Sequence, residues 1–340
     1  MIEIVDFDEG QLFRDIKPDE EKYTIFHHKE WLSVLQKQYR CKPFYISNNN
    51  SNKALLPICE VKILGKKKWV SLPFSDYVPS VFESESELLK SLDYLIEKAN
   101  LNGVKFIELK FDTLSHNKFS KKQVAYSHIT QLTNDTETLF KSFKKTRVQQ
   151  PITKSHREGI NVTITNNYKD MEIFYKLHLM TRKKLGVPIQ PKNFFKLVYE
   201  KLIRSDLGFI SIAEKDNIPL SAGIFAGFGK TLTYKYGASN PEYLKLRANH
   251  SMIWEAMKEA VNRDYKYFDF GKTDMENKGL RQFKLGWATK EFPVYYSYYP
   301  EVPAGETLNS INKKIVEPII KTAPQFVCQI LGELFYKYMA

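Results

Sequence analysis

The chain has 340 residues, of which 43% are hydrophobic and 14% aromatic, enough for two domains with well-filled cores. Its net charge of +12 favours an anionic partner: a nucleic acid, a nucleotide-linked or thioester-carried substrate, or an anionic membrane surface. Plain solubility is the alternative explanation of the lysines. The composition predicts a globular protein, and no apolar run reaches the length of a membrane span.

The cysteines and the N-terminus indicate the compartment. Cys41, Cys59 and Cys328 show no pair spacing and no zinc motif, so we expect free thiols in a reducing cytoplasm and no metal site. Residues 1–9 are acidic and lack a basic stretch followed by an apolar run, so we expect no signal peptide.

The first half of the chain predicts a helix, an antiparallel meander, a second helix and a closing strand. Apolar spacing predicts the helices, and short β-rich runs separated by turn residues predict the strands. In chain order these are a helix over 26–35, strands over 43–47, 54–61 and 69–72, a helix over 85–99 and a strand over 104–109.

The second half repeats this order. It predicts a helix over 171–184, strands over 209–213, 220–225 and 231–237, a helix over 250–261 and a strand over 267–270. Residues 99–109 also align with residues 260–270, with alanine and lysine kept and apolar, aromatic and acidic types agreeing nearby. Together these observations favour two copies of one α/β unit over chance similarity. We expect domains at 1–134 and 135–300, followed by a tail at 301–340.

A basic segment over 141–157 joins the two copies and contains no acidic residue. A solvated helix face is the ordinary interpretation of such a run, but clefts often form at domain junctions. Pro151 is expected to break or kink the helix there.

The tail over 306–340 is predicted to be helical, with interruptions at Pro318 and Pro324. Val327, Leu331, Leu334 and Tyr338 share one face, with Phe326 and Ile330 beside it. We expect this tail to pack on the body, and peripheral attachment to a membrane is the alternative.

Aromatic residues surround one carboxylate in residues 267–270, and a basic aromatic loop follows over 278–287. Lys278, Arg281 and Lys284 are three residues apart and share a helical face, while Leu280, Phe283 and Trp287 line a neighbouring one. The apolar face can pack while the basic face meets an anion.

Several site classes find no support. The chain has no Walker or dinucleotide glycine motif, no His-Glu-x-x-His, no cysteine pair with zinc spacing and no Gly-x-Ser-x-Gly. A nucleic-acid module would rest on charge alone.

A succession of motifs resembles a known family. It includes the helix bearing Trp31, Ser71 to Tyr77, Lys154 to Ile160, Thr181 to Pro188 and Tyr236 to Ser239. It continues with Arg247 to His250, Phe268 to Gly271 and finally Gly279-Leu280-x-x-Phe283-Lys284-x-Gly286-Trp287. This order is similar to that of the FemAB-like acyltransferases, particularly the BioF-like branch.

The resemblance implies an α/β (α+β) fold of two tandem GNAT-like domains, each a mixed, mainly antiparallel sheet flanked by helices. It also implies acyl transfer to an amine, with acyl-CoA or aminoacyl-tRNA as co-substrate and no bound cofactor. The N-terminal domain would form the acceptor side of a cleft, and the second would hold the donor at Phe283 and Lys284. The pyrophosphate loop typical of GNAT enzymes is not evident, and the lysine-rich arm of the best-known bridge-building enzymes is missing.

The catalytic candidates are Lys284, Phe283 and Asp76. Lys284 matches the lysine of the family motif and would stabilise developing charge or a donor phosphate; an exposed surface lysine is the alternative. Phe283 would shape the pocket. Asp76 would accept a proton or hold the acceptor amine, and a simple turn residue is the alternative.

The binding candidates come from both copies of the repeated unit. They are Tyr77, Trp31, Arg147, Arg247, Asn249, His250 and Asp269. Three of them open the helix near residue 250, where backbone N–H groups favour an anion, although His250 could be only a helix-start residue. Asp269 could instead orient a buried hydrogen-bond network.

We therefore expect a cytoplasmic N-acyltransferase that moves an acyl group from an acyl-CoA-type donor to an amine of a cell-envelope or polysaccharide precursor. It would be free in the cytoplasm or peripheral to the inner face of the membrane. Aminoacyl-tRNA-dependent formation of peptidoglycan cross-bridges is an alternative. A non-catalytic RNA- or membrane-binding protein is another.

Overall fold

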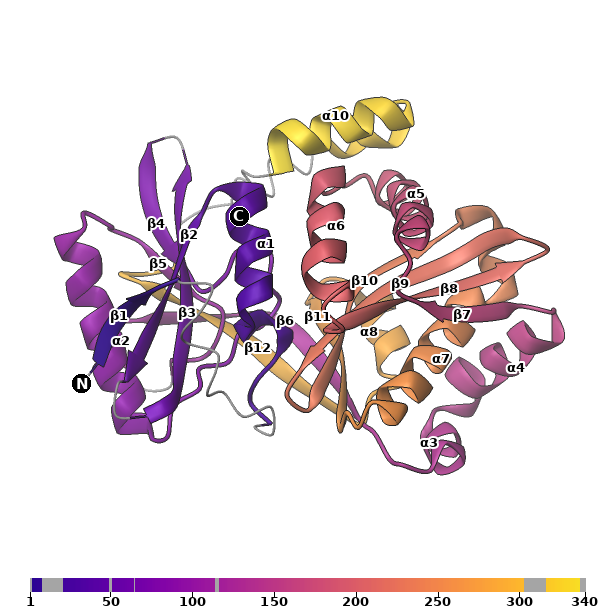
Figure 1. Ribbon diagram of the computed structural model, residues 1–340, viewed down its shortest axis with the longest axis horizontal. Coiled ribbons are helices and arrows are strands. Elements are labelled where there is room, and N and C mark those ends of the chain that lie inside the picture. The colour runs from indigo at the N-terminus through magenta and orange to yellow at the C-terminus, as the bar shows by residue number, and fades with distance from the viewer. Residues whose placement is uncertain are drawn as a thin grey trace.

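A computed structural model describes residues 2–7, 21–48, 51–63, 65–113, 116–302 and 316–336 (Figure 1). One 12-stranded sheet runs through both halves of the molecule. Its strand order is β1-β2-β3-β4-β5-β12-β6-β11-β10-β9-β8-β7. Tyr338, part of the expected tail and part of the turn between the strands predicted over 43–47 and 54–61 lie outside the described residues.

In the first half, β1, β2, β3 and β4 form an antiparallel meander, and a helix then leads to β5. The elements are β1 (Ile2–Asp6), α1 (Lys29–Tyr39), β2 (Lys42–Asn48), β3 (Ser51–Ile63), β4 (Lys66–Val70), α2 (Glu85–Leu101) and β5 (Ile107–Leu109). β4 and β5 run parallel because the α2 crossover separates them.

The second half repeats the meander and the helical crossover. Its elements are α5 (Tyr168–Leu185), α6 (Lys192–Val198), β8 (Gly208–Lys215), β9 (Ile218–Phe228), β10 (Thr231–Ser239), α7 (Ala248–Asn262) and β11 (Tyr267–Asp274). β10 and β11 are again parallel. The aligned segments 99–109 and 260–270 thus occupy equivalent places, ending in β5 and β11.

Two long strands join the halves. β6 (Ser120–Gln131) pairs with β11 and with β12 (Lys290–Tyr299), and β12 pairs with β5. A strand from near the C-terminal end of the second half therefore lies beside β5, the strand that follows the crossover in the first half. The sequence analysis did not predict β6 or β12, or the edge strands β1 and β7 (Asn161–Thr165).

Helices cover both faces of the sheet. α2 packs on the core of the first half, and α7 packs on the core of the second. A third core spans both halves because α1 packs against α6, with Trp31 and Phe194 in edge-to-face contact at 6.2 Å. The predicted α/β class, with a mainly antiparallel sheet flanked by helices, is confirmed.

The basic segment forms α3 (Thr136–Ser142), a π-helical turn η2 (Lys145–Gln149) and α4 (Gln150–Arg157). Pro151 lies in the first turn of α4, where a missing N–H removes no intrahelical hydrogen bond. The expected interruption therefore takes the form of a π-helical turn before the proline.

The tail contains helical residues 316–322 and α10 (Gln325–Phe335). Pro324 separates the two helices as predicted, but Pro318 lies inside the first one, so no interruption occurs at that position. Cys328 and Gly332 are buried against the body. Leu334 is exposed rather than packed, because the buried stripe of α10 is offset from the predicted face.

Candidate functional site

A cleft of ≈ 800 Å³ lies between the two halves. The first half contributes Asp76 from the loop after β4, and Lys110 from the end of β5. The second half contributes residues of α5, β10 and α8 (Lys278–Lys284). The cleft brings together the loop and the Phe283-Lys284 motif, which are more than 200 residues apart in the sequence.

Irregularities in two strands shape the cleft wall. The register of β9 with β10 shifts between Tyr234 and Tyr236, so Lys235 is the extra, bulged residue. The register of β11 with β6 also shifts, at Gly271, whose φ is +66°. A Cβ at Gly271 would lie 2.8 Å from Asp76 Oδ2, so the close approach of this loop requires glycine.

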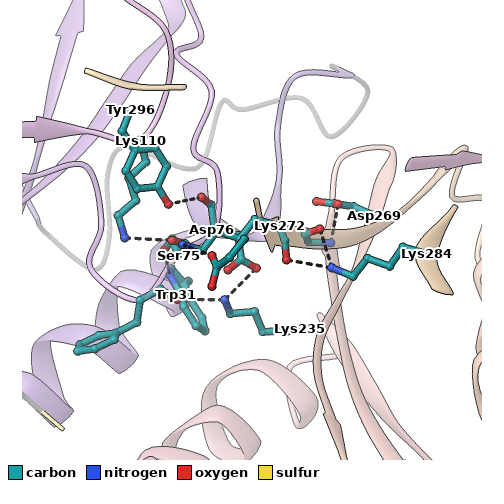
Figure 2. Close-up of polar contacts among 12 residues, drawn as sticks. Trp31, Ser75, Asp76, Lys110, Lys235, Asp269, Lys272, Lys284 and Tyr296 are labelled. Carbon is teal, nitrogen blue, oxygen red and sulfur yellow. Dashed lines mark hydrogen bonds and ion pairs between the residues drawn. The ribbon is translucent and has the colours of Figure 1, made fainter. Parts of the chain in front are cut away.

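A cluster of lysines surrounds Asp76 (Figure 2). Lys235 Nζ lies 3.3 Å from Asp76 Oδ2 and donates to the carbonyl of Phe74 at 3.0 Å. Lys110 Nζ donates to the carbonyl of Ser75 at 3.0 Å. One half-buried carboxylate among several ammonium groups leaves an excess of positive charge, which suits an anionic donor or a developing oxyanion.

Lys284 is buried, only 6% exposed, which rules out the surface-lysine alternative. Its ammonium donates to the carbonyls of Gly271 and Lys272, both at 2.9 Å. An ammonium has three N–H donors, so one remains for a substrate in the cleft that Lys284 lines. Burial lowers the pKa of Lys284 to about 8. The negative charges of Asp76 and Asp269 act in the opposite direction but do not cancel the effect of burial.

Asp76 remains ionised in this setting. Burial by itself would raise its pKa, but Lys235, Lys272 and Lys284 outweigh burial and bring the pKa below its usual value. Tyr296 also fixes the loop by donating to the Asp76 carbonyl at 2.7 Å. A carboxylate with a lowered pKa is a weak base but a good partner for a cationic or polar amine.

Asp269 is a residue of β11, two positions before Gly271. Its carboxylate accepts the N–H of Gly271 at 2.8 Å, across the bulge of β11. Burial, reinforced by nearby Asp76, raises the pKa of Asp269 to about 6 despite that hydrogen bond. Asp269 therefore helps to hold the turn that supplies the carbonyl partners of Lys284.

Aromatic side chains fix the α8 motif in place. His250 contacts Phe283 edge to face at 5.3 Å and stacks on Trp287 at 5.9 Å. His250 also bonds the Arg147 carbonyl at 3.2 Å, and burial lowers its pKa to about 4, so the ring is neutral. Phe283 and Asn249 line the cleft, whereas His250 supports them from behind.

The other binding candidates support the residues around the cleft. Trp31 is buried and donates its indole N–H to Ser75 at 2.9 Å, so it supports the Asp76 loop. Tyr77 packs against Phe292, with ring centroids 6.2 Å apart. Arg147 donates to the Gln282 side chain at 2.8 Å and so braces α8.

Arg247 lies at a second cavity of ≈ 450 Å³, between α4 and the start of α7. Lys154 and Arg157 line the same cavity. This cavity is therefore basic, and it joins the junction segment to the helix start that the sequence analysis singled out.

Sequence reasoning did not select several cleft residues. These are Lys110, Lys235, Lys272, His178, Arg182 and Tyr336. A signal existed for two of them: Lys110 directly follows the aligned segment 99–109, and Arg182 lies in the quoted Thr181–Pro188 motif. Lys235, in contrast, looks like an ordinary residue of an aromatic strand until the bulge is known.

The described residues contain no group of three His, Cys, Asp or Glu side chains able to hold a metal ion. Within the same residues, no helix has the length and apolarity needed to cross a membrane.

Comparison with known proteins shows which proteins this chain resembles. The profile of the acetyltransferase (GNAT) domain matches residues 144–284, which include the basic segment, β10 and α8. A lipid II:glycine glycyltransferase of Staphylococcus epidermidis is 36% identical over 127 residues, covering 35% of this chain and 30% of that relative. The resemblance to the FemAB-like GNAT family that the motifs predicted is confirmed.

A second glycyltransferase gives a similar match. A lipid II:glycine glycyltransferase of Staphylococcus haemolyticus is 28% identical over 171 residues, which cover 46% of this chain and 41% of the relative. The matches thus span less than half the length of these curated relatives.

Solved structures confirm the FemAB-like fold across both halves. The crystal structure of FemX superimposes with a TM-score of 0.65 at 15% identity, covering 86% of this chain and 94% of that one. The C-terminal domain of a putative lysylphosphatidylglycerol synthetase from Agrobacterium fabrum follows at 0.54, 13% identity and coverages of 85% and 91%. The expected arrangement of two GNAT-like units with C-terminal helices is confirmed.

Proposed function

We propose that this chain is an N-acyltransferase that joins an acyl or aminoacyl group to an amine of a cell-envelope precursor. The observation that carries the proposal is the buried Lys284 ammonium, with one N–H left for a substrate, in the same cleft as the ionised Asp76. The names of the glycyltransferase relatives support a cell-envelope acceptor.

In the proposed reaction the neutral amine attacks the carbonyl carbon of an activated ester or thioester. As the C–N bond forms, negative charge develops on the carbonyl oxygen and positive charge on the nitrogen. Lys284 stabilises the oxygen and Asp76 the nitrogen. When the C–O or C–S bond to the leaving group breaks, that group takes up the proton that the nitrogen releases.

The relatives favour an aminoacyl donor over the acyl-CoA donor that the sequence alone put first, since they are named glycyltransferases. The basic cavity lined by Lys154, Arg157 and Arg247 suits a polyanionic donor of either kind. We therefore put aminoacyl-tRNA first and keep acyl-CoA as the second candidate.

One assay separates the donors. Purified protein is given an amine acceptor together with either aminoacyl-tRNA or acyl-CoA, and the acylated product and the free donor are measured. We expect product with charged tRNA and no release of CoA. Release of CoA without any response to tRNA would identify acyl-CoA as the donor. Salt-sensitive binding of a donor, without turnover of aminoacyl-tRNA or acyl-CoA, would indicate a non-catalytic binding protein.

We also propose that the chain works at the membrane periphery, with α10 as its point of contact. An acceptor carried on a lipid would require such contact.

A further inference from the structure

α10 presents an apolar surface although it is docked on the protein. Phe326, Ile330 and Leu334, one helical turn apart, are 63%, 53% and 55% exposed, and Phe335 beside them is 53% exposed. The helix has a single charged residue, Glu333. Contiguous large apolar side chains of this kind are rare on a soluble monomer and mark a surface that binds a partner or a membrane.

This exposure belongs to the docked helix and does not come from loose packing. Gly332 is buried so closely that an added Cβ would lie 2.3 Å from the Ile189 carbonyl. Cys328 is 2% exposed on the same side, and Glu333 accepts the backbone N–H of Lys192 at 2.9 Å. One side of α10 is thus firmly attached, and the opposite side keeps its aromatic and aliphatic residues in solvent.

The apolar surface continues to the rim of the cleft. Leu185 and Leu244 line the cleft and are 57% and 43% exposed. A groove of ≈ 390 Å³ shares Lys184 and Pro241 with the cleft and reaches Gln325, the first residue of α10. The cleft mouth and the exposed face of α10 therefore belong to one stretch of surface.

Lysines are interspersed with these apolar residues. Lys183, Lys184 and Lys321 all line the connecting groove. Lys321 pairs with Glu317 at 2.7 Å, and Glu242 also lies in the groove, but the lysines are in excess. Apolar side chains among cations are the features by which an interfacial helix binds an anionic bilayer. A second copy of this chain would bring the same positive charge to the contact.

We infer that α10, helical residues 316–322 and the leucine rim of the cleft form a face that binds an anionic phospholipid bilayer. On that face the cleft mouth opens toward the lipid, so an amine acceptor anchored in the bilayer enters from the membrane side. The second part of this inference rests on the proposed function. In Figure 1, α10 lies at the top of the molecule and the basic α4 lies at the lower right, so donor and acceptor would approach from different sides.

Binding to vesicles tests the face without any turnover. The full chain is centrifuged with vesicles of phosphatidylcholine alone or of phosphatidylcholine mixed with phosphatidylglycerol. We expect binding that is tighter by about tenfold or more with phosphatidylglycerol, and largely lost in the double variant Phe326→Ser/Ile330→Ser. The matched control is Leu101→Ser, which removes a 72% exposed leucine from α2 on the other half of the molecule.

Equal vesicle binding by the parent and the double variant would overturn the inference, as would an equal loss in the Leu101→Ser control. The mass of the protein in solution is measured over a concentration series in parallel. A dimer that the double variant abolishes, together with no vesicle binding by the parent, would assign the face to a second copy of the chain.

Turnover then tests the direction of entry. The acceptor probe is lipid II embedded in phosphatidylglycerol-containing vesicles, compared with the same amine on a water-soluble tail. We expect Phe326→Ser/Ile330→Ser to lose most turnover on the embedded acceptor and to retain it on the soluble one. Equal rates of the double variant and the parent on the embedded acceptor would overturn entry from the membrane. If the parent acylates neither acceptor with any donor, the proposed function fails while the vesicle-binding result stands.

Discussion

At the scale of single residues, burial determines the chemistry of the candidate site. Lys284 and Asp269 belong to neighbouring segments, and burial shifts the pKa of both toward neutrality, to about 8 and about 6. Asp76 is half-buried beside them, but its lysine partners hold its pKa below the usual value. At pH 7 Lys284 is therefore mainly protonated and both carboxylates are mainly ionised, but Lys284 and Asp269 titrate close to neutral pH, which is typical of a reactive cleft.

Lys284→Met is expected to reduce kcat by about 10²–10³-fold, because it removes a cation placed for the developing oxyanion. In the parent, kcat should also fall as the pH rises through about 8, where Lys284 loses its proton. With the same acceptor, the variant should not show this fall of kcat with rising pH. Lys278→Met is the control, since Lys278 lies on the same helix but is exposed. Unchanged turnover in Lys284→Met would remove the lysine from the mechanism.

Asp269→Asn is expected to stabilise the protein at neutral pH. The raised pKa means that the folded state binds more protons than the unfolded state between the ordinary value of 3.8 and about 6. The free energy of unfolding therefore falls as pH rises through that window, and the full penalty remains at pH 7. Asparagine keeps the acceptor for Gly271, so Tm should rise by roughly 2 °C at pH 7.

Thermal unfolding at two pH values checks this prediction. Near pH 4 the carboxyl group is largely protonated in the folded state, and the parent and Asp269→Asn should have nearly equal Tm. If Asp269→Asn raises Tm by the same amount at both pH values, the charge of the Asp269 carboxylate is not the cause of the increase.

At the scale of elements, a short helix carries the motif and needs external support. Arg281 of α8 makes two bonds to Glu291 of β12, at 2.9 and 2.7 Å, and its guanidinium lies 3.8 Å from the Tyr126 ring centroid. His128 of β6 contacts the same carboxylate at 2.8 Å. The two strands that join the halves thus also hold the helix that bears Lys284.

Glu291→Gln should lower kcat by about tenfold with a smaller effect on KM, because it loosens α8 without touching the cleft. The loss should be non-additive with Arg281→Gln, since both variants break the same contact. The control is Glu137→Gln, which removes a pair that is exposed on both sides. Additive losses in the double variant, or a change in KM alone, would contradict a positioning role for Glu291.

The sequence predicted the meanders and their crossover helices because apolar spacing there is regular. It missed β6 because lysine and polar residues interrupt the pattern in Ser120–Gln131. It missed β12 although that strand is rich in Phe, Tyr and Val, and Pro293 within it argues against a central strand. These strands lie in the middle of the sheet, where long-range pairing with β5 and β11 stabilises them and local propensity contributes little.

At the scale of the whole molecule, the repeated halves are connected by exchanged strands. β12 fills the position beside β5, and β6 lies between β12 and β11. The division into domains at 1–134, 135–300 and 301–340 remains a prediction.

A fragment of residues 1–134 should fail to fold on its own, since the edge of β5 would lack β12 and stay unpaired. Co-expression with residues 135–340 should yield a soluble complex, because β12 is then available. Solubility and the cooperativity of thermal unfolding measure the outcome. Cooperative unfolding of the isolated fragment would contradict this dependence.

The sequence by itself determined the two-copy organisation and the α/β class, and it singled out Phe283-Lys284 as site candidates, since each rests on local patterns or short motifs. Only the tertiary structure decided which charges meet. The bulge at Lys235, the approach of Asp76 to Gly271 and the burial of Lys284 all depend on strand register and on packing between distant segments. Register and burial are properties of the assembled sheet, so no local pattern in the chain could predict them.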